Sequence, residues 1–252
     1  MIRSNRRRKP GRKAASVRRI MRGLLQGLAL SALASLMVTG GWWLNRALTV
    51  QTWQIHGVPE ILEVAIEKEL KGQEPLDLVH AWPSRLRIHL LGAIPDLAEV
   101  NIVRQLPDRL EISATMRMPV GLWRNSKGTV QLVDGQGLAY RPLKAGEMLD
   151  LPLLRVSAEE LGESVALMLK LKQEDETRYA RLSEWIGEGD AWKLNFERGR
   201  SWLLPRGSLA GDRMEQVIAL MQGPRWKNGD WRIDVRADNR WFIRKSKLGG
   251  MV

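Results

Sequence analysis

The sequence predicts an α+β protein in which a single transmembrane helix is followed by a β-α-α-β-β unit. A mixed β domain with an antiparallel sheet and flanking helices completes the chain. Three observations predict this class. Residues 23–44 carry no charge, residues 48–117 show strand and helix periodicities in turn, and residues 118–246 form short apolar runs separated by turn residues. A chain of 252 residues is long enough to bury a core in such domains.

The apolar segment is long enough to cross a bilayer. At 1.5 Å per residue, the 22 residues from Gly23 to Leu44 reach about 33 Å, against a hydrocarbon thickness of about 30 Å. Trp42 and Trp43 lie at its far end, where amphipathic rings favour the headgroup layer. Ten Lys or Arg residues and no acid precede Gly23. The positive-inside rule therefore predicts a cytoplasmic tail over residues 1–22, a membrane helix over 23–45 and an external C-terminal part.

Two features of the apolar segment have alternative interpretations. Ala32-Leu33-Ala34 resembles a signal-peptide cleavage site, but the apolar run continues past it, which favours an uncleaved anchor. Small residues recur at every fourth position, a pattern that allows close approach of membrane helices or simply reflects a weakly hydrophobic anchor. The residues of this stripe are Gly23, Gly27, Ser31, Ser35 and Thr39.

Composition limits the possible functions of the folded part. After the basic tail, 30 basic residues stand against 28 acidic ones, so the folded part lacks the charge excess typical of nucleic-acid binding. The chain has no cysteine, which excludes disulfides and thiolate metal sites. Eleven Trp accompany only two Tyr and two Phe, and we expect Trp to fill core positions rather than to form a binding surface.

Residues 48–117 are predicted to form the β-α-α-β-β unit. Pro59 suits the start of a helix and Gly72 its end, whereas Pro83 is expected to break the second helical or turn segment. The expected elements are a strand over Val50–His56, a helix from Pro59 to Gly72, a helix or turns over Leu76–Leu90, and strands over Ala98–Arg104 and Arg109–Thr115.

Residues 118–246 are predicted to form the β domain, followed by a tail over 247–252. Asp134-Gly135 indicates a hairpin turn, and Ser157 with Glu160 forms a plausible capping box. The expected strands are Val120–Arg124, Thr129–Val133, Leu138–Arg141, Trp185–Ile186, Trp192–Phe196, Ser201–Leu204, Trp231–Arg236 and Arg240–Lys245. Helices are expected after Glu160, with Leu161, Val165, Met168, Leu169 and Lys172 on one face, and over Asp212–Met221.

Catalytic and metal-binding patterns are weak in this sequence. The three histidines, His56, His80 and His89, have spacings that match no metal motif. No Ser-x-x-Lys or Gly-x-Ser-x-Gly pattern is present, and Asp134-Gly135-Gln136-Gly137 is better interpreted as a hairpin than as a dinucleotide loop. We therefore expect no cofactor, no metal, no small-molecule substrate and no enzymatic activity, although carboxylates brought together in space could still form a site.

Several short motifs, taken in order, resemble the FtsQ/DivIB family of bacterial cell-division proteins. The resemblance covers most of the chain, with departures at Met116, Pro205 and Ala237, and at Arg155 or Val156, where the family has Gly. The matching segments are Ile55-His56-Gly57, Val100–Ile112, Pro119-Val120-Gly121-Leu122-Trp123, Leu132-Val133-Asp134 with Gly137, Leu151-Pro152-Leu153-Leu154 as a turn, and Ile233-Asp234-Val235-Arg236. The resemblance implies that residues 48–117 form a POTRA domain and that the chain is a non-enzymatic scaffold of the division machinery. It implies the inner membrane and the division septum as the location, with the C-terminal part in the periplasm.

The resemblance also implies partners and a binding region. Family members link early and late division proteins and bind the single-pass proteins FtsB and FtsL, thereby influencing septal peptidoglycan synthesis, and the end of the β domain makes the FtsB contact. From the residues, the last predicted strand suits strand addition by a partner. Alternation would place Trp241, Ile243 and Lys245 on one face and Phe242 and Arg244 on the other, and a bulky Trp or Phe on the open side would be the anchor. Arg236, Arg240 and Arg244 would suit an acidic partner segment. Alternatively, the aromatics seal the core and the arginines protect an edge. Two other functions stay open: a POTRA-bearing assembly or secretion subunit, and an anchored cell-wall enzyme.

Overall fold

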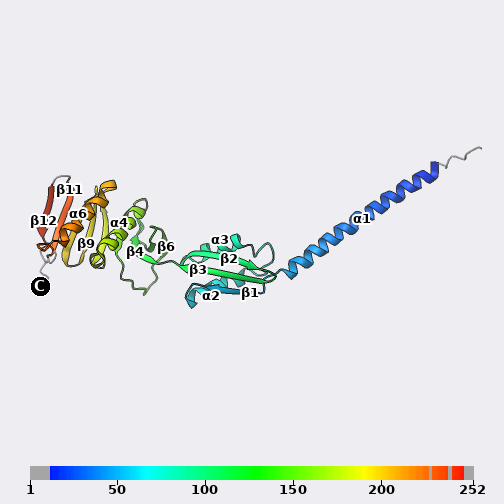
Figure 1. Ribbon diagram of the computed structural model, residues 1–252, viewed down its shortest axis with the longest axis horizontal. Coiled ribbons are helices and arrows are strands. Elements are labelled where there is room, and N and C mark those ends of the chain that lie inside the picture. The colour runs from blue at the N-terminus through cyan, green and yellow to red at the C-terminus, as the bar shows by residue number, and fades with distance from the viewer. Residues whose placement is uncertain (1–11, 227–228, 238–239, 247–252) are drawn as a thin grey trace, which may run out of the picture. The chain divides into compact units, whose positions relative to one another are not determined.

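The computed structural model describes residues 12–226, 229–237 and 240–246, and their side chains from Met21 onward. The chain divides into two compact units. One comprises Met1–Leu90 and Val100–Ala114, and the other comprises Leu91–Glu99 and Thr115–Val252. Within these units the fold is α+β, with one N-terminal apolar helix and a large mixed sheet, as Figure 1 shows. The expected tail 247–252 and the turn Asp238-Asn239 lie outside the described residues.

Helix α1 spans Arg12–Ala47, and its part Met21–Ala47 is long and apolar enough to cross a membrane. Its large apolar side chains are exposed, among them Leu28, Leu36 and Trp43. The helix starts at Arg12, so the second half of the expected tail, residues 12–22, is helical. Lys, Arg and Ala are good helix formers, and Pro10-Gly11 comes just before the first turn.

The β-α-α-β-β order of the first folded unit is confirmed. Its sheet has the strand order β1-β3-β2, in which β1 runs parallel to β3. The elements are β1 (Thr52–His56), α2 (Glu60–Gly72), α3 (Pro83–Ala93), β2 (Leu97–Gln105) and β3 (Arg109–Met116). One apolar face of each helix is buried, with Leu62, Ile66 and Leu70 on α2 and Leu86 and Leu90 on α3.

Proline positions explain the helix boundaries of this unit. Pro59 is the N-cap residue of α2, which ends at Gly72 as predicted. The segment Leu76–Leu90, predicted as a helix or turns broken at Pro83, consists of turns followed by α3, which begins at Pro83. Proline is well tolerated in the first helical turn because its missing N–H would have no intrahelical partner there.

A sheet of nine strands forms the second unit, in the order β12-β11-β10-β9-β8-β7-β4-β5-β6. The pattern of short strands was predicted correctly. The strands are β4 (Pro119–Arg124), β5 (Val130–Asp134), β6 (Ala139–Pro142), β7 (Leu153–Arg155), β8 (Leu182–Glu188), β9 (Ala191–Phe196), β10 (Arg200–Pro205), β11 (Trp231–Ala237) and β12 (Arg240–Lys245).

The sheet is mixed, whereas the sequence had suggested an antiparallel one. The pairs β4–β7, β7–β8 and β10–β11 are parallel. Leu153 and Leu154, expected to lie in a turn, belong to the interior strand β7 (Leu153–Arg155), which lies between β8 and β4. A strand of three residues carries too little periodicity to be recognised. The chain leaves β7 and β10 through helical crossovers, and such crossovers return it parallel to the strand that it left.

Two helices, α4 (Leu161–Glu174) and α6 (Ala210–Gln222), lie across the sheet, and the short α5 (Glu176–Tyr179) follows α4 (Figure 1). Their apolar faces share one core with the inward side chains of the strands. In α4 the innermost position near the C-terminus is Leu171, not Lys172. Trp185, Trp192 and Trp202 are fully buried in this core, as expected for a chain that uses Trp in place of Phe and Tyr.

Two glycines of the family-like motifs occupy backbone positions that side chains rarely adopt. Gly57 has a φ of +87°, and a Cβ there would lie 2.5 Å from the carbonyl oxygen of Ala114. Gly137 has a φ of +79°, and a Cβ there would lie 2.6 Å from the Cα of Gly162. Each glycine is therefore required both by its backbone conformation and by a close neighbour.

We predict that Gly57→Ala destabilises the protein by roughly 1–3 kcal/mol, because the residue would be strained and would displace β3. Gly72→Ala is the matched control, since Gly72 ends α2 and a methyl group added there would have no neighbour within 4 Å. It should be neutral or stabilising by about 0.4–1 kcal/mol. Urea unfolding of the two variants measures both effects, and equal stability would contradict the prediction.

Candidate binding site at the sheet edge

Strand β12 ends the nine-stranded sheet, and β11 is its neighbour among the described strands. Every second backbone N–H and C=O of such a strand points away from the sheet, where another strand can pair with it. The opposite edge, β6, is shorter and ends at Pro142, which has no N–H to donate. Of the two ends of this sheet, β12 is therefore the better template for an added strand.

The pairing of β11 with β12 is regular over four residues and then broken. Trp231 lies opposite Lys245, Arg232 opposite Arg244, Ile233 opposite Ile243 and Asp234 opposite Phe242. A bulge then shifts the register, so that Arg240 pairs with Ala237. The regularly paired part of β12 is therefore Phe242–Lys245, and Arg240 lies beyond the bulge.

The side chains of β12 divide between the two faces as the sequence indicated. Trp241 and Ile243 pack against the core, which agrees with the alternative in which these residues seal the interior. Phe242 points to the open face and is 52% exposed. Arg244 is also exposed on that face. The strand thus keeps one large apolar side chain available beside its free edge.

A shallow groove of about 490 Å³ lies on the open face next to β12. Its floor comes from four neighbouring strands, β9 to β12. The lining residues are Lys193, Ser201, Leu203, Arg232, Ile233, Asp234, Phe242 and Arg244. The groove therefore combines an apolar surface at Leu203 and Phe242 with three cations and one carboxylate.

Two cations of the groove repel each other. Arg232 and Arg244 face one another directly across β11 and β12, and like charges at opposite positions destabilise a strand pair. Within the described part of the chain, Arg244 has no ion-pair partner, and the guanidinium of Arg232 donates only to the carbonyl of Gly199, at 3.3 Å. The third cation, Lys193, pairs with Glu188 at 3.2 Å. The described residues thus leave unbalanced positive charge in this groove.

The carboxylate of the groove is already neutralised. The guanidinium of Arg236 donates two hydrogen bonds to the carboxylate of Asp234, from Nε to Oδ1 at 3.0 Å and from Nη2 to Oδ2 at 2.8 Å. The hydrogen bonds from Arg236 lower the pKa of Asp234. Arg236 was predicted to face a partner. In this structure its guanidinium forms an ion pair with Asp234.

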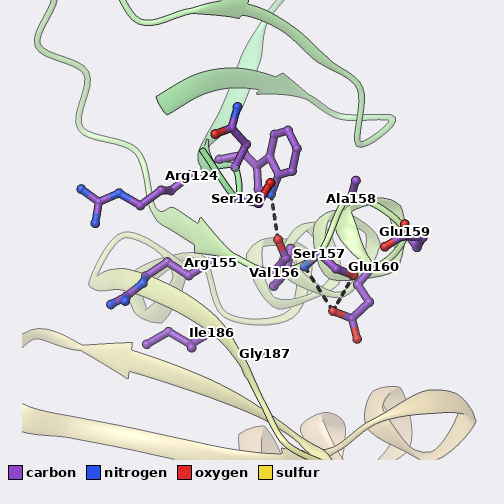
Figure 2. A pocket seen from close by; sticks show the side chains of 12 residues that line it. Arg124, Ser126, Arg155, Val156, Ser157, Ala158, Glu159, Glu160, Ile186 and Gly187 are labelled. Atoms are coloured by element: carbon purple, nitrogen blue, oxygen red, sulfur yellow. Dashed lines mark hydrogen bonds between the residues drawn. The ribbon is translucent and has the colours of Figure 1, made fainter. Parts of the chain in front are cut away.

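A second hollow of about 700 Å³ lies beyond the carboxyl ends of the parallel strands β4, β7 and β8 (Figure 2). Arg124 and Arg155 extend from adjacent strand ends in the same direction. On the other side of the hollow, Glu160 accepts hydrogen bonds from the backbone N and the hydroxyl of Ser157, at 3.2 and 2.9 Å. Glu160 also pairs with Arg206. The predicted capping box is thus half formed, and its carboxylate serves as a structural acceptor.

The sequence reasoning missed a network around Arg117 and Arg141, because its members are distant in sequence. Arg117 pairs with Asp134 and donates from Nη2 to the carbonyl of Leu97 at 3.0 Å. Arg141 donates from Nε to Asp96 at 2.6 Å and pairs with Glu147, whose pKa it lowers to about 2. Within the second unit, the network joins Asp96 and Leu97 to the β5–β6 hairpin. No periodicity or spacing in the sequence brings these residues together.

The remaining candidate positions stay separate. His56 ends β1, His80 pairs with Asp77, and His89 approaches Glu69 at 3.2 Å. Among the described residues no group of His, Asp and Glu could hold a metal ion. The predicted association stripe of α1, including Gly23, Gly27, Ser31 and Ser35, lies on an exposed helix, and its role stays a prediction.

A scan against models of protein families gave no match for this chain, and a search of curated proteins gave none either.

We predict that Arg244→Glu stabilises the free protein by roughly 0.2–1 kcal/mol, because it converts a repulsive cross-strand pair with Arg232 into an attractive one. Lys245→Glu is the matched control. It makes the same change of charge, but Lys245 lies opposite Trp231 and not opposite an arginine. The midpoints of denaturant unfolding measure both. A loss of stability in the first variant would show that the two arginines do not repel.

Proposed function

We propose that this chain is a membrane-anchored scaffold that captures an extended acidic segment of another protein by adding it to the sheet beside β12. The single observation that carries the proposal is the juxtaposition of Arg232 and Arg244 along a free strand edge. An incoming strand would complete the backbone hydrogen bonds, and its acidic side chains would relieve the repulsion. Phe242 would supply an apolar anchor in the groove.

The proposed scaffold belongs to bacterial cell division. The support is the ordered set of sequence motifs that resemble the FtsQ/DivIB family, together with an architecture compatible with it: an apolar helix, a β-α-α-β-β unit and a terminal β domain. On this proposal, the β-α-α-β-β unit is a POTRA domain and the captured segment belongs to a partner of the FtsB or FtsL type. The N-terminus lies in the cytoplasm and the folded units lie in the periplasm, since ten cations precede the helix.

A second function is less well supported. An assembly or secretion subunit with a POTRA domain would share the anchor and the first unit but would have no need for a cationic edge on β12. An anchored cell-wall enzyme would need a reactive group in one of the hollows. In the larger hollow, Glu160 is engaged by Ser157 and Arg206.

We predict that proline substitution within β12 abolishes partner capture. In an antiparallel pair, adjacent residues alternate between N–H groups directed at the neighbour and N–H groups directed outward. In one of the two variants Phe242→Pro and Ile243→Pro, the lost N–H group is therefore one that points away from β11. The hydrogen bonds between β11 and β12 then remain. This variant should weaken binding of a co-expressed FtsB-type partner by roughly tenfold or more while it keeps every hydrogen bond to β11, and Phe242→Pro also leaves the core contacts of Ile243 in place. Co-purification and unfolding curves measure both properties.

Arg244→Glu provides the control for folding, because it should stabilise the free protein while its added negative charge repels an acidic partner segment. If this more stable variant no longer captures the partner, the loss comes from weaker binding and not from unfolding. Undiminished capture by Arg244→Glu and by both proline variants would refute strand addition at β12.

The division assignment has its own test. A fluorescent fusion of the full chain, expressed in dividing bacterial cells, should gather at midcell in constricting cells. A fusion truncated after Ala47 separates the contribution of the folded units from that of the membrane helix. Uniform membrane fluorescence of the full chain would favour the assembly or secretion function instead.

A further inference from the structure

The turn that connects α2 to α3 is fastened to the end of the membrane-spanning helix. The side chain of Asn45, in the last turn of α1, accepts a hydrogen bond from the backbone N of Leu78 at 3.2 Å and donates to Asp77 at 3.4 Å. The backbone N of Val50 donates to the carbonyl of Leu76 at 2.9 Å. Three hydrogen bonds thus fix this turn beside residues 45–50.

Asp77 makes the turn rigid as well as attached. Its Oδ1 accepts hydrogen bonds from the backbone N of Val79 at 3.0 Å and of His80 at 2.8 Å. The hydrogen bond from the His80 backbone is the largest influence that lowers the pKa of Asp77, to about 2. The carboxylate is therefore ionised at neutral pH and keeps this turn in one conformation.

The turn between β2 and β3 is fastened to the same segment. The backbone N of Gln51 donates to the carbonyl of Asp108 at 2.8 Å, and the guanidinium of Arg104 donates to the carbonyl of Leu48. Both turns therefore lie within hydrogen-bonding distance of the few residues that follow the apolar span.

These two turns carry large apolar side chains that the rest of the described chain does not cover. Val79 is 63% exposed, Trp82 is 61% exposed and Leu106 is 71% exposed. Val79 lies within the first turn, and Trp82 closes it just before α3. Leu106 lies in the turn between β2 and β3. The three side chains thus project from the end of the unit that is attached to α1.

The depth of the attachment points follows from helix geometry. From Trp43 to Leu48 is five residues, or about 7.5 Å along a helix. The headgroup layer is roughly 5–7 Å thick on each side of the hydrocarbon core. With Trp42 and Trp43 at the interface, Asn45 and Leu48 lie in the headgroup layer or at its outer boundary. The two turns bonded to them lie at the same level.

We propose that Val79, Trp82 and Leu106 form a lipid-contacting surface that seats the β-α-α-β-β unit on the outer face of the membrane. The inference rests on α1 spanning the bilayer, as in the proposed function, but not on the identity of any partner. The occupant is a lipid surface because the three side chains continue directly from the membrane helix. Trp favours the interface, and Leu and Val gain from leaving water there. The contact would restrict the swing of the unit about the end of α1.

The absence of cysteine allows a direct test in the full chain. Single variants V79C and L106C carry an environment-sensitive NBD label, and the protein is reconstituted in phosphatidylcholine vesicles with or without spin-labelled lipid. I61C is the matched control: Ile61 is 79% exposed, and β1 carries the chain about 16 Å away from the turns before α2 begins. L33C, in the middle of the apolar span, reports on insertion of α1 through quenching by a second lipid that carries its spin label in the acyl chain.

The labels on V79C and L106C should show blue-shifted emission that headgroup-level spin labels quench, whereas the label on I61C should behave as in water. If V79C and L106C match I61C while L33C is quenched, the lipid-contacting surface is refuted and the anchor stands. If L33C is also not quenched, α1 does not span the bilayer, and the inference fails together with the anchored scaffold.

Discussion

A β-sheet that ends in water leaves outward N–H and C=O groups along its last strand, and in this protein that strand is β12. The other parts of the second unit determine which strand this is. The helical crossover through α6 returns the chain parallel to β10, and the hairpin then places β12 outermost. The shorter edge at β6 ends in a proline. Because α4 and α6 pack on the core face, no described helix covers the open face beside β12.

The charges beside β12 would determine which kind of partner segment this edge can bind. Asp234, the one acid among the described residues of the groove, is held by Arg236, so Arg232 and Arg244 have no carboxylate partner in the described part of the chain. Natural sheets often place charges on edge strands to prevent unwanted pairing. Here the same charges would repel a second copy of the edge and admit an acidic segment. On the proposed function, one arrangement would both disfavour self-association and select an acidic partner.

Periodicity and turn chemistry account for the parts that the sequence predicted well. Pro59 and Gly72 bound α2, and alternation in Arg240–Lys245 correctly separated Trp241 and Ile243 from Phe242 and Arg244. Two kinds of feature were beyond such reasoning. Leu153–Arg155 is too short to show a period and is defined by its neighbours in the sheet. The pairing of Arg117 with Asp134 and of Arg141 with Asp96, like the opposition of Arg232 and Arg244, depends on tertiary register, which a single sequence does not reveal.

The bulge between Asp234 and Ala237 sets the reach of the proposed contact. Only four residues of β12, Phe242 to Lys245, continue in regular register, which corresponds to about 13 Å of ladder. So short a template supplies few main-chain bonds, and the partner must be held chiefly by its side chains. If binding rests on so few side-chain contacts, a single substitution in the partner segment would remove a large share of its affinity.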